Sequence, residues 1–336
     1  MVKSFITGCS GTSLSQAELN FLKQEDPWGL ILFRRNCESA AQVRDLVSSF
    51  RDAVGRDNAP VLIDQEGGRV QRLQPPIWHK YPAAQKFGDL YRIDRERGRQ
   101  AAWLTARLIA YDLKELGITV DCLPLLDAGR PETSDVIGDR AYCENIDAVT
   151  DLGRQTAGGL MTGGVLPVMK HIPGHGRAVV DSHLELPVVD TSLEELDGHD
   201  FVPFKKLKSL PLAMTAHILF PQIDARQPVT QSKYIIENVI RGRIGFSGCL
   251  MSDDISMKAL GGSIKERCQA SFSAGCDLVL HCNGDLAEMQ EVAASSPNLS
   301  GTAQLRCNNA LSLLKSSITG FDVDAGRAKL CALLGD

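Results

Sequence analysis

Long apolar runs are missing from this sequence. No uninterrupted apolar stretch approaches the roughly 20 residues that a helix needs to cross a bilayer. The N-terminal segment contains one lysine and then a short apolar stretch that stops at Ser10 and Gly11, which is too little for the hydrophobic centre of a signal peptide. We therefore expect no contact with a membrane and no export.

An excess of positive charge is also missing. The 36 lysines and arginines are outnumbered by 41 aspartates and glutamates, which gives a net charge of -5, and the basic residues are scattered along the chain. Nucleic-acid binding favours a clustered basic surface, so we expect no DNA or RNA partner. With 43% hydrophobic and 23% charged residues, the composition is typical of a globular protein with a large core.

Paired cysteines are the third absence. The ten cysteines stand singly, without a Cys-x-x-Cys motif or the compact spacing of a disulfide framework. Isolated thiols in a large apolar chain usually behave as small buried hydrophobic residues in a reducing compartment. We therefore expect a cytoplasmic protein whose cysteines are structural.

Linkers, internal repeats and low-complexity tracts are absent too, so we expect residues 1–336 to form one domain. Short β-rich apolar segments alternate with longer amphipathic segments, which is the pattern of repeated strand–helix units. Eight such strands close a (β/α)8 barrel. The expected strands are residues 4–7, 29–33, 60–63, 119–123, 166–169, 212–215, 249–252 and 277–281.

A doubly wound open sheet is the alternative fold, and it would normally have a Gly-rich phosphate-binding turn after its first strand. The sequence there is GCSGTS, so the pattern favours a TIM-type barrel of the α/β class. Two of the helices expected between the strands begin with capping-box spacing, from Ser15 to Glu18 and from Ser192 to Glu195. The late segment AQLRCNNALSLLKSS is expected to form a closing helix.

In such a barrel, the loops after the carboxyl ends of the strands carry the active site. Ionisable residues gather at these positions in the sequence, as a polar active site requires. They are residues 34–36, 64–69 and 170–176, followed by His217, Asp253, Asp254 and His281.

The densest polar segment is KHIPGHGRAVVDSHLELP, residues 170–187. Its glycines and its length are typical of a catalytic loop that is mobile without substrate. Within it, Asp181 and His183 are spaced so that the carboxylate can fix the tautomer of the imidazole and stabilise the imidazolium during proton transfer. The alternative is a solvated loop in which these two residues are incidental.

The segment GCLMSDDIS places two carboxylates at the end of a strongly apolar strand, where an unused charge would be costly. Strand alternation puts Asp253 on the same side as Cys249 and Met251, and Asp254 on the other side. We therefore expect Asp253 to face the centre of the site. Capping of the following turn is the alternative role, and it fits Asp254 better than Asp253.

Two further segments combine carboxylates with guanidinium groups. IDQEGGRVQRL brings Asp64, Arg69 and Arg72 together around a Gly-Gly turn, and SDVIGDR adds Arg140 after the fourth expected strand. Such groups can make paired hydrogen bonds to the vicinal hydroxyls of a sugar. Ordinary surface ion pairs are the alternative.

Taken together, these segments resemble the bacterial β-N-acetylhexosaminidases of glycoside hydrolase family 3, of the single-domain cytoplasmic kind used in cell-wall recycling. Five segments match in the family's order along nearly the whole chain. They are GLILFRRN, IDQEGGRVQRL, SDVIGDRAY, KHIPGHG followed by DSH, and VIRGRIGFSGCLMSDDISM.

The resemblance implies a barrel without metal or cofactor and retention of configuration through a covalent glycosyl-enzyme. Asp253 would be the nucleophile, and His183 the general acid/base with Asp181 as its partner. The implied substrates are β-linked N-acetylglucosaminyl compounds, typically N-acetylglucosaminyl-anhydromuramyl-peptides. The residues that would hold the sugar are Asp64, Arg72, Arg140, Lys170 and His171.

Two other functions are compatible with a barrel of this kind. A metal-dependent amidohydrolase would also present His and Asp at the mouth, but the sequence has no His-x-His pair after the first expected strand. A non-catalytic sugar sensor would be expected to lack the nucleophile or the His–Asp pair, and both are present.

Overall fold

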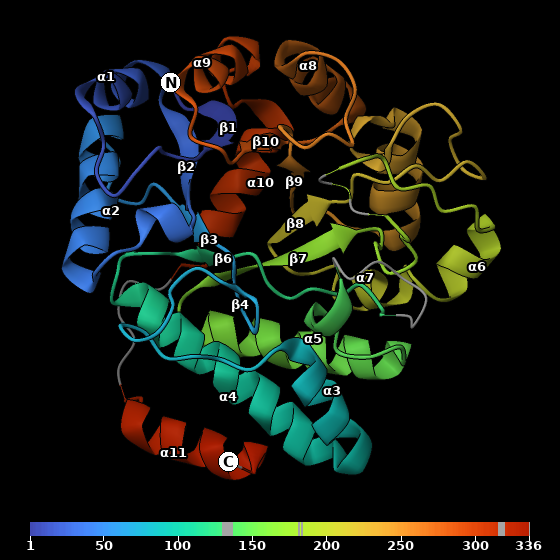
Figure 1. The fold of residues 1–336 in the computed structure, drawn as a ribbon. Helices are drawn as coiled ribbons and strands as arrows, with labels where there is room; N and C mark the ends of the chain where they lie inside the picture. Colours follow the sequence, from blue (N-terminus) through green and yellow to red (C-terminus); the bar gives the residue numbers. More distant parts are fainter. Residues whose placement is uncertain (130–136, 181, 183, 315–319, 336) are drawn as a thin grey trace.

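The computed structural model describes residues 1–129, 137–180, 182, 184–314 and 320–335. Within them, eight parallel strands close into a barrel (Figure 1), in the order β1-β10-β9-β8-β7-β6-β3-β2. The barrel strands are β1 (Lys3–Thr7), β2 (Pro27–Leu32), β3 (Val61–Ile63), β6 (Val120–Asp121), β7 (Leu166–Ile172), β8 (Leu212–Thr215), β9 (Cys249–Asp254) and β10 (Leu278–His281). The expected (β/α)8 barrel is therefore confirmed, and the open sheet is excluded.

The expected and observed strands differ mainly in length. β6 comprises only Val120 and Asp121, although residues 119–123 were expected, because Pro124 has no N–H to extend the ladder. β7 is longer than expected and continues to Ile172. Lys170 and His171 therefore belong to a buried strand rather than to a loop, and the barrel wall holds them at the mouth.

Alternate side chains of the strands point into the barrel and toward the surrounding helices. Leu62 and Met251 belong to the inner cluster, whereas Ile63 and Leu250 pack outward among the helices. The predicted alternation along β9 is therefore confirmed as far as Met251. Burial on both faces stabilises the strands, since each fully buried Leu or Ile contributes about 1.5–3 kcal/mol.

Helices surround the barrel and close its amino-terminal end (Figure 1). They are α1 (Gln16–Glu25), α2 (Ala40–Val54), α3 (Ala84–Ile93), α4 (Arg95–Lys114), α5 (Ile146–Thr162), α6 (Leu193–Gly198), α7 (Val202–Lys206), α8 (Ile264–Ala274), α9 (Leu286–Ser295), α10 (Gly301–Leu311) and α11 (Val323–Leu334), with the π-helix η4 (Ile235–Ile244) and the short 3-10 turns η1 (Arg34–Asn36), η2 (Gly138–Arg140) and η3 (Val229–Gln231).

The two expected capping boxes have different outcomes. Ser15 and Glu18 form the full reciprocal box at the start of α1. At the start of α6, the Ser192 hydroxyl accepts from the backbone N–H of Glu195, as expected. The Glu195 carboxylate, however, pairs with Arg177 at 2.7 Å, because that guanidinium offers a charged partner.

The C-terminal tail was only partly predicted. The expected closing helix is α10, which ends at Leu311 and brings Cys307 to within 3.4 Å of Cys249 between their sulfur atoms. The following helix α11 was not predicted. It lies against α4 (Figure 1), where Arg97 donates to the carbonyl of Leu333 at 2.6 Å.

A two-stranded hairpin after β3 was also missed. It consists of β4 (Gln65–Gly67) and β5 (Val70–Gln71), which pair antiparallel. Gly67 and Gly68 have φ angles of 94° and 57°, and a Cβ on Gly67 would lie 2.2 Å from the carbonyl oxygen of Pro82. The two glycines therefore allow a tight turn that returns the chain to the barrel mouth.

The cysteines largely follow the prediction. They are free thiols, and all are buried except Cys143, which is half-buried, and Cys331, which is exposed on α11. Among the described residues, no helix is both long enough and apolar enough to cross a membrane.

Candidate active site

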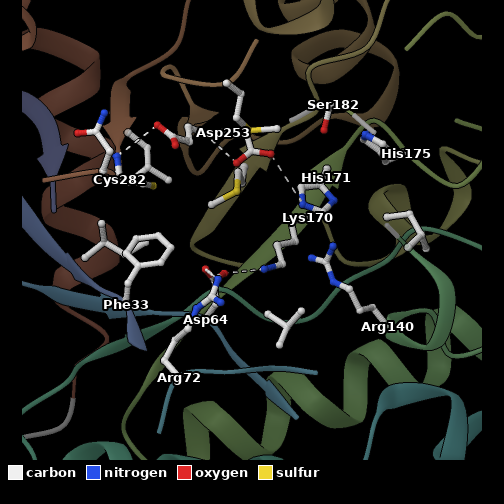
Figure 2. A pocket seen from close by; sticks show the side chains of 18 of the residues that line it. Phe33, Asp64, Arg72, Arg140, Lys170, His171, His175, Ser182, Asp253 and Cys282 are labelled. Carbon is white, nitrogen blue, oxygen red and sulfur yellow. Dashed lines mark hydrogen bonds and ion pairs between the residues drawn. The ribbon is translucent and has the colours of Figure 1, made fainter. Parts of the chain in front are cut away.

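The carboxyl ends of the barrel strands surround a pocket of about 480 Å³. Figure 2 shows side chains from opposite parts of the barrel converging on it. Among the residues expected from the sequence, its lining contains Asp64, Arg72, Arg140, Lys170, His171 and Asp253.

Lys170 connects two carboxylates at the base of this pocket. Its Nζ lies 2.8 Å from Asp64 (Figure 2) and 2.6 Å from Glu66. Burial alone would lower the pKa of Lys170, but the two carboxylates hold it above its ordinary value. The ammonium is therefore charged, and in the described part of the chain two of its three N–H donors have partners, which leaves one for a ligand.

Asp64 is held from both sides. Arg72 donates to its second carboxylate oxygen at 3.0 Å, opposite the Lys170 contact. Burial alone would raise the pKa of Asp64, but Lys170 and Arg72 hold it well below its usual range. The carboxylate remains ionised and can accept hydrogen bonds from sugar hydroxyls.

Glu66 is a site residue that the sequence prediction omitted. It accepts two hydrogen bonds from Arg140, at 2.9 Å to Nε and 2.8 Å to Nη2. Burial favours the neutral acid, but Arg140 and Lys170 outweigh it and hold the pKa of Glu66 at about 2. Glu66 therefore orients Arg140 and Lys170 together. Its place in the DQEGG segment was the available signal.

Asp121 shows what burial does where no cation is in contact. It is fully buried at the end of β6 and accepts a hydrogen bond from the backbone N–H of Gln65 at 3.0 Å. Burial raises the pKa of Asp121 well above its ordinary value. This carboxyl is therefore protonated at neutral pH, unlike Asp64.

Asp253 lies at the end of β9 with 19% of its side chain exposed. One carboxylate oxygen accepts from the backbone N–H of Asp254 at 2.8 Å, and the other lies 3.9 Å from Nε2 of His171 (Figure 2). Burial would raise the pKa of Asp253, but His171, His217 and the backbone N–H of Asp254 hold it below its ordinary value. The carboxylate is ionised, and no lysine or arginine among the described residues pairs with it.

Asp127, which the sequence prediction also omitted, orients His171. Its fully buried carboxylate lies 2.7 Å from Nδ1 of His171 and accepts from the backbone N–H of His175 at 2.6 Å. The Nδ1 contact aims Nε2 of His171 toward Asp253. Burial lowers the pKa of His175 to about 4, so this neighbouring ring is neutral at pH 7.

Asp254 turns away from the pocket centre to hold the chain around it. It accepts from the backbone N–H of Ser256 at 3.0 Å and its hydroxyl at 2.7 Å, and from the backbone N–H of Cys282 at 3.2 Å. The Asp254 carbonyl also lies 3.0 Å from Nε2 of His217. These contacts agree with the turn-capping role expected for Asp254.

The remaining sequence predictions have mixed outcomes. Arg69 does not join Asp64 and Arg72, because it pairs with Asp139 at 3.0 Å near the rim of the pocket. Asp181 and His183 lie outside the described residues. Ser182, between them, is described and lines the pocket.

The arrangement suits the binding of a neutral polyhydroxylated ligand. Ionised groups at the base supply donors and acceptors, and Asp253 supplies an ionised carboxylate close by. The described residues contain no group of three or more His, Cys, Asp or Glu side chains that could hold a metal ion.

Comparisons with known proteins agree with this geometry. Residues 5–312 match the model for the glycosyl hydrolase family 3 N-terminal domain. A beta-hexosaminidase from Alkalilimnicola ehrlichii is 39% identical over 82% of this chain and 79% of its own length. One from Xylella fastidiosa is 34% identical over 94% of this chain and 92% of its own.

Solved structures show the same fold. NagZ from Neisseria gonorrhoeae, crystallised in complex with N-trifluoroacetyl-D-glucosamine, has a TM-score of 0.87 and 29% identity, over 99% of this chain and 98% of that one. The fold and the polar mouth are those of a barrel glycoside hydrolase. The matches show that the chain belongs to glycosyl hydrolase family 3. Within this family it is a β-N-acetylhexosaminidase, and the amidohydrolase alternative is set aside.

Proposed function

We propose that this protein removes a β-linked N-acetylglucosamine from the non-reducing end of its substrate, with retention of configuration. The observation that carries the proposal is the contrast at the pocket between Asp253, which is ionised and has no cationic side-chain partner among the described residues, and the tightly paired cluster around Lys170. The cluster would hold the sugar, and the unpaired carboxylate would attack it.

In the proposed first step, a carboxylate oxygen of Asp253 forms a bond to the anomeric carbon as the bond to the leaving oxygen breaks. His183, with Asp181 as its partner, would give a proton to that oxygen. In the second step, His183 would take a proton from water, whose oxygen attacks the anomeric carbon and releases Asp253. Two inversions give net retention.

The sugar-binding roles follow from the contacts in the pocket. Asp64 would accept from hydroxyls, and Lys170, Arg72 and Arg140 would donate to oxygens of the bound sugar. His171 would contact the sugar beside Asp253. The ligand of the NagZ structure is an N-acylated glucosamine, which supports the same sugar class here.

The finer assignment rests on the family resemblance and the cell biology it implies. We propose N-acetylglucosaminyl-1,6-anhydro-N-acetylmuramyl-peptides as substrates, in the cytoplasm, during peptidoglycan recycling. We also propose that residues 1–336 form a single catalytic domain. The barrel draws strands from Lys3 to His281, and α11 packs back on α4, which supports this division.

A comparison of matched chromogenic substrates tests the proposed function. We expect hydrolysis of a β-N-acetylglucosaminide, little hydrolysis of the β-glucoside, and rates that a chelator does not change. Proton NMR of the first-formed sugar should show the β anomer. Equal rates on both substrates would contradict the sugar assignment, and an initial α anomer would contradict retention.

A further inference from the structure

Arg35 is a pocket residue whose role the proposed reaction leaves unexplained. It lies in η1, directly after β2, and its exposed side chain forms part of the pocket lining. Its Nε donates to the carbonyl of Cys9 at 2.9 Å, and its Nη2 donates to the carbonyl of Cys282. Two backbone acceptors therefore fix the guanidinium, although it is exposed.

The surroundings of Arg35 are built to fit it. A Cβ on Gly8 would lie 3.0 Å from the Arg35 Nη2 and 2.5 Å from the Cys282 carbonyl oxygen, so glycine leaves room for this contact. The Arg35 guanidinium lies 5.0 Å from the centre of the Phe33 ring, at cation–π distance. An orientation fixed in this way costs a ligand little additional ordering.

The charge of Arg35 is uncompensated, in contrast to the other cations of the pocket. Arg69, Arg72, Arg140 and Lys170 each pair with a carboxylate. Over the described ranges, Arg35 contacts carbonyl oxygens but pairs with no carboxylate, and its Nη1 makes no hydrogen bond. Peptide carbonyls orient a guanidinium without neutralising it, so Arg35 remains available to an anion.

We infer that Arg35 binds a carboxylate on the leaving group and thereby selects acidic aglycones. This inference rests on the proposed function and adds a specificity-determining residue to it. A guanidinium suits the task because its planar N–H donors match the two oxygens of a carboxylate.

The position of Arg35 agrees with a role toward the leaving group. The cluster that would hold the sugar comes from β3, β7 and their loops, whereas Arg35 follows β2 and contacts Cys282 after β10. Asp253 and Asp254, on β9 beside β10, carry negative charge toward the same side. An anionic aglycone would be repelled there without a cation to offset these carboxylates.

Two disaccharides with the same leaving oxygen provide the test. One is N-acetylglucosaminyl-1,6-anhydro-N-acetylmuramic acid with its free lactyl carboxylate, and the other is its neutral methylamide. We expect kcat/KM for the acid to exceed that for the amide at least tenfold in the wild type. The ratio should fall close to one in Arg35→Gln and take an intermediate value in Arg35→Lys, which retains the charge but loses the fork.

Arg34→Gln is the matched control, because Arg34 is adjacent in sequence, is not part of the pocket lining and donates to the carbonyl of Cys37. It removes the same charge and should retain the wild-type ratio. Salt titration of the wild type gives a readout that no variant's folding can affect. Raising ionic strength should lower kcat/KM for the acid much more than for the amide.

The outcomes separate this inference from the proposed function. No hydrolysis of either disaccharide would contradict the proposed function itself. Hydrolysis of both with a wild-type ratio near one would contradict only the role of Arg35. A high ratio that survives in Arg35→Gln, or that falls equally in Arg34→Gln, would also overturn it.

Discussion

The two sides of the barrel mouth treat charge in opposite ways. On the side of β3 and β7, Asp64 and Glu66 are paired with Lys170 and with one arginine each, at distances between 2.6 and 3.0 Å. On the side of β9, Asp253 accepts a backbone N–H and faces His171 at 3.9 Å. Carboxylates that are almost equally buried therefore have very different partners.

The difference explains how one pocket can both bind and react. A paired carboxylate has little tendency to attack a carbon atom, but it can accept hydrogen bonds from a neutral sugar without moving. A carboxylate without a cationic side-chain partner retains its nucleophilicity, although burial makes its charge costly. Binding and nucleophilic roles should therefore separate cleanly when single carboxylates on the two sides are changed.

Asp253→Asn should break this contrast most severely. The amide is nearly isosteric, so fold and sugar binding should persist, while kcat falls by about 10⁴-fold or more because the covalent step is lost. Steady-state kinetics and the affinity for N-acetylglucosamine measure the two effects separately. A variant that still turns over at one-tenth of the wild-type rate would contradict the nucleophile assignment.

His183→Ala sharpens the comparison by asking what lies outside both sides. If His183 protonates the leaving oxygen, substrates with poor leaving groups should slow by about 10²- to 10⁴-fold, and activated aryl glycosides far less. Asp181→Asn should act in the same direction but more weakly, because the imidazole remains. A uniform loss across leaving groups would indicate that the loop only binds.

Glu66→Gln tests the paired side through pH. The ordinary pKa of about 4.5 falls to about 2 in the folded protein, so ionised Glu66 contributes stability above about pH 4.5, and this contribution disappears as the pH falls toward 2. The variant should be less stable than the wild type by about 3 kcal/mol at pH 7, with a difference that narrows at pH 3.

Urea unfolding at both pH values measures this difference. Glu291→Gln, at an exposed position on α9, is the matched control and should change stability by less than about 0.5 kcal/mol. A Glu66 variant whose loss is equally large at pH 3 and pH 7 would show that packing, rather than charge, explains it.

The sequence predicted the barrel better than it predicted the ends of the chain. Apolar strands buried on both faces leave a strong local pattern, so all eight were found with small errors in length. The β4–β5 hairpin was missed because its strands are short and polar. Helix α11 was missed because its position depends on contacts with α4, which are remote in sequence.

The site shows a similar limit. Asp64 and Lys170 were found because each stands in a segment that resembles a family motif. Glu66 and Asp127 were not, since their importance depends on Arg140 and His171, which approach them only in the folded barrel. Sequence can place a charge at a strand end, but it cannot show which partner neutralises that charge.

Asp254→Asn should have the smallest effect of these changes, although it alters the carboxylate next to Asp253. The asparagine oxygen can still accept from the backbone N–H groups of Ser256 and Cys282, and its NH₂ can donate to the Ser256 hydroxyl. We therefore expect a stability loss of about 1 kcal/mol or less, and activity within about tenfold of the wild type. With a slow fluorinated N-acetylglucosaminide, mass spectrometry of the digested variant should still find the sugar on Asp253. A label on residue 254 of the wild type, or the loss of all labelling in Asp254→Asn while Asp253→Asn still becomes labelled, would reverse the assignment of the two carboxylates.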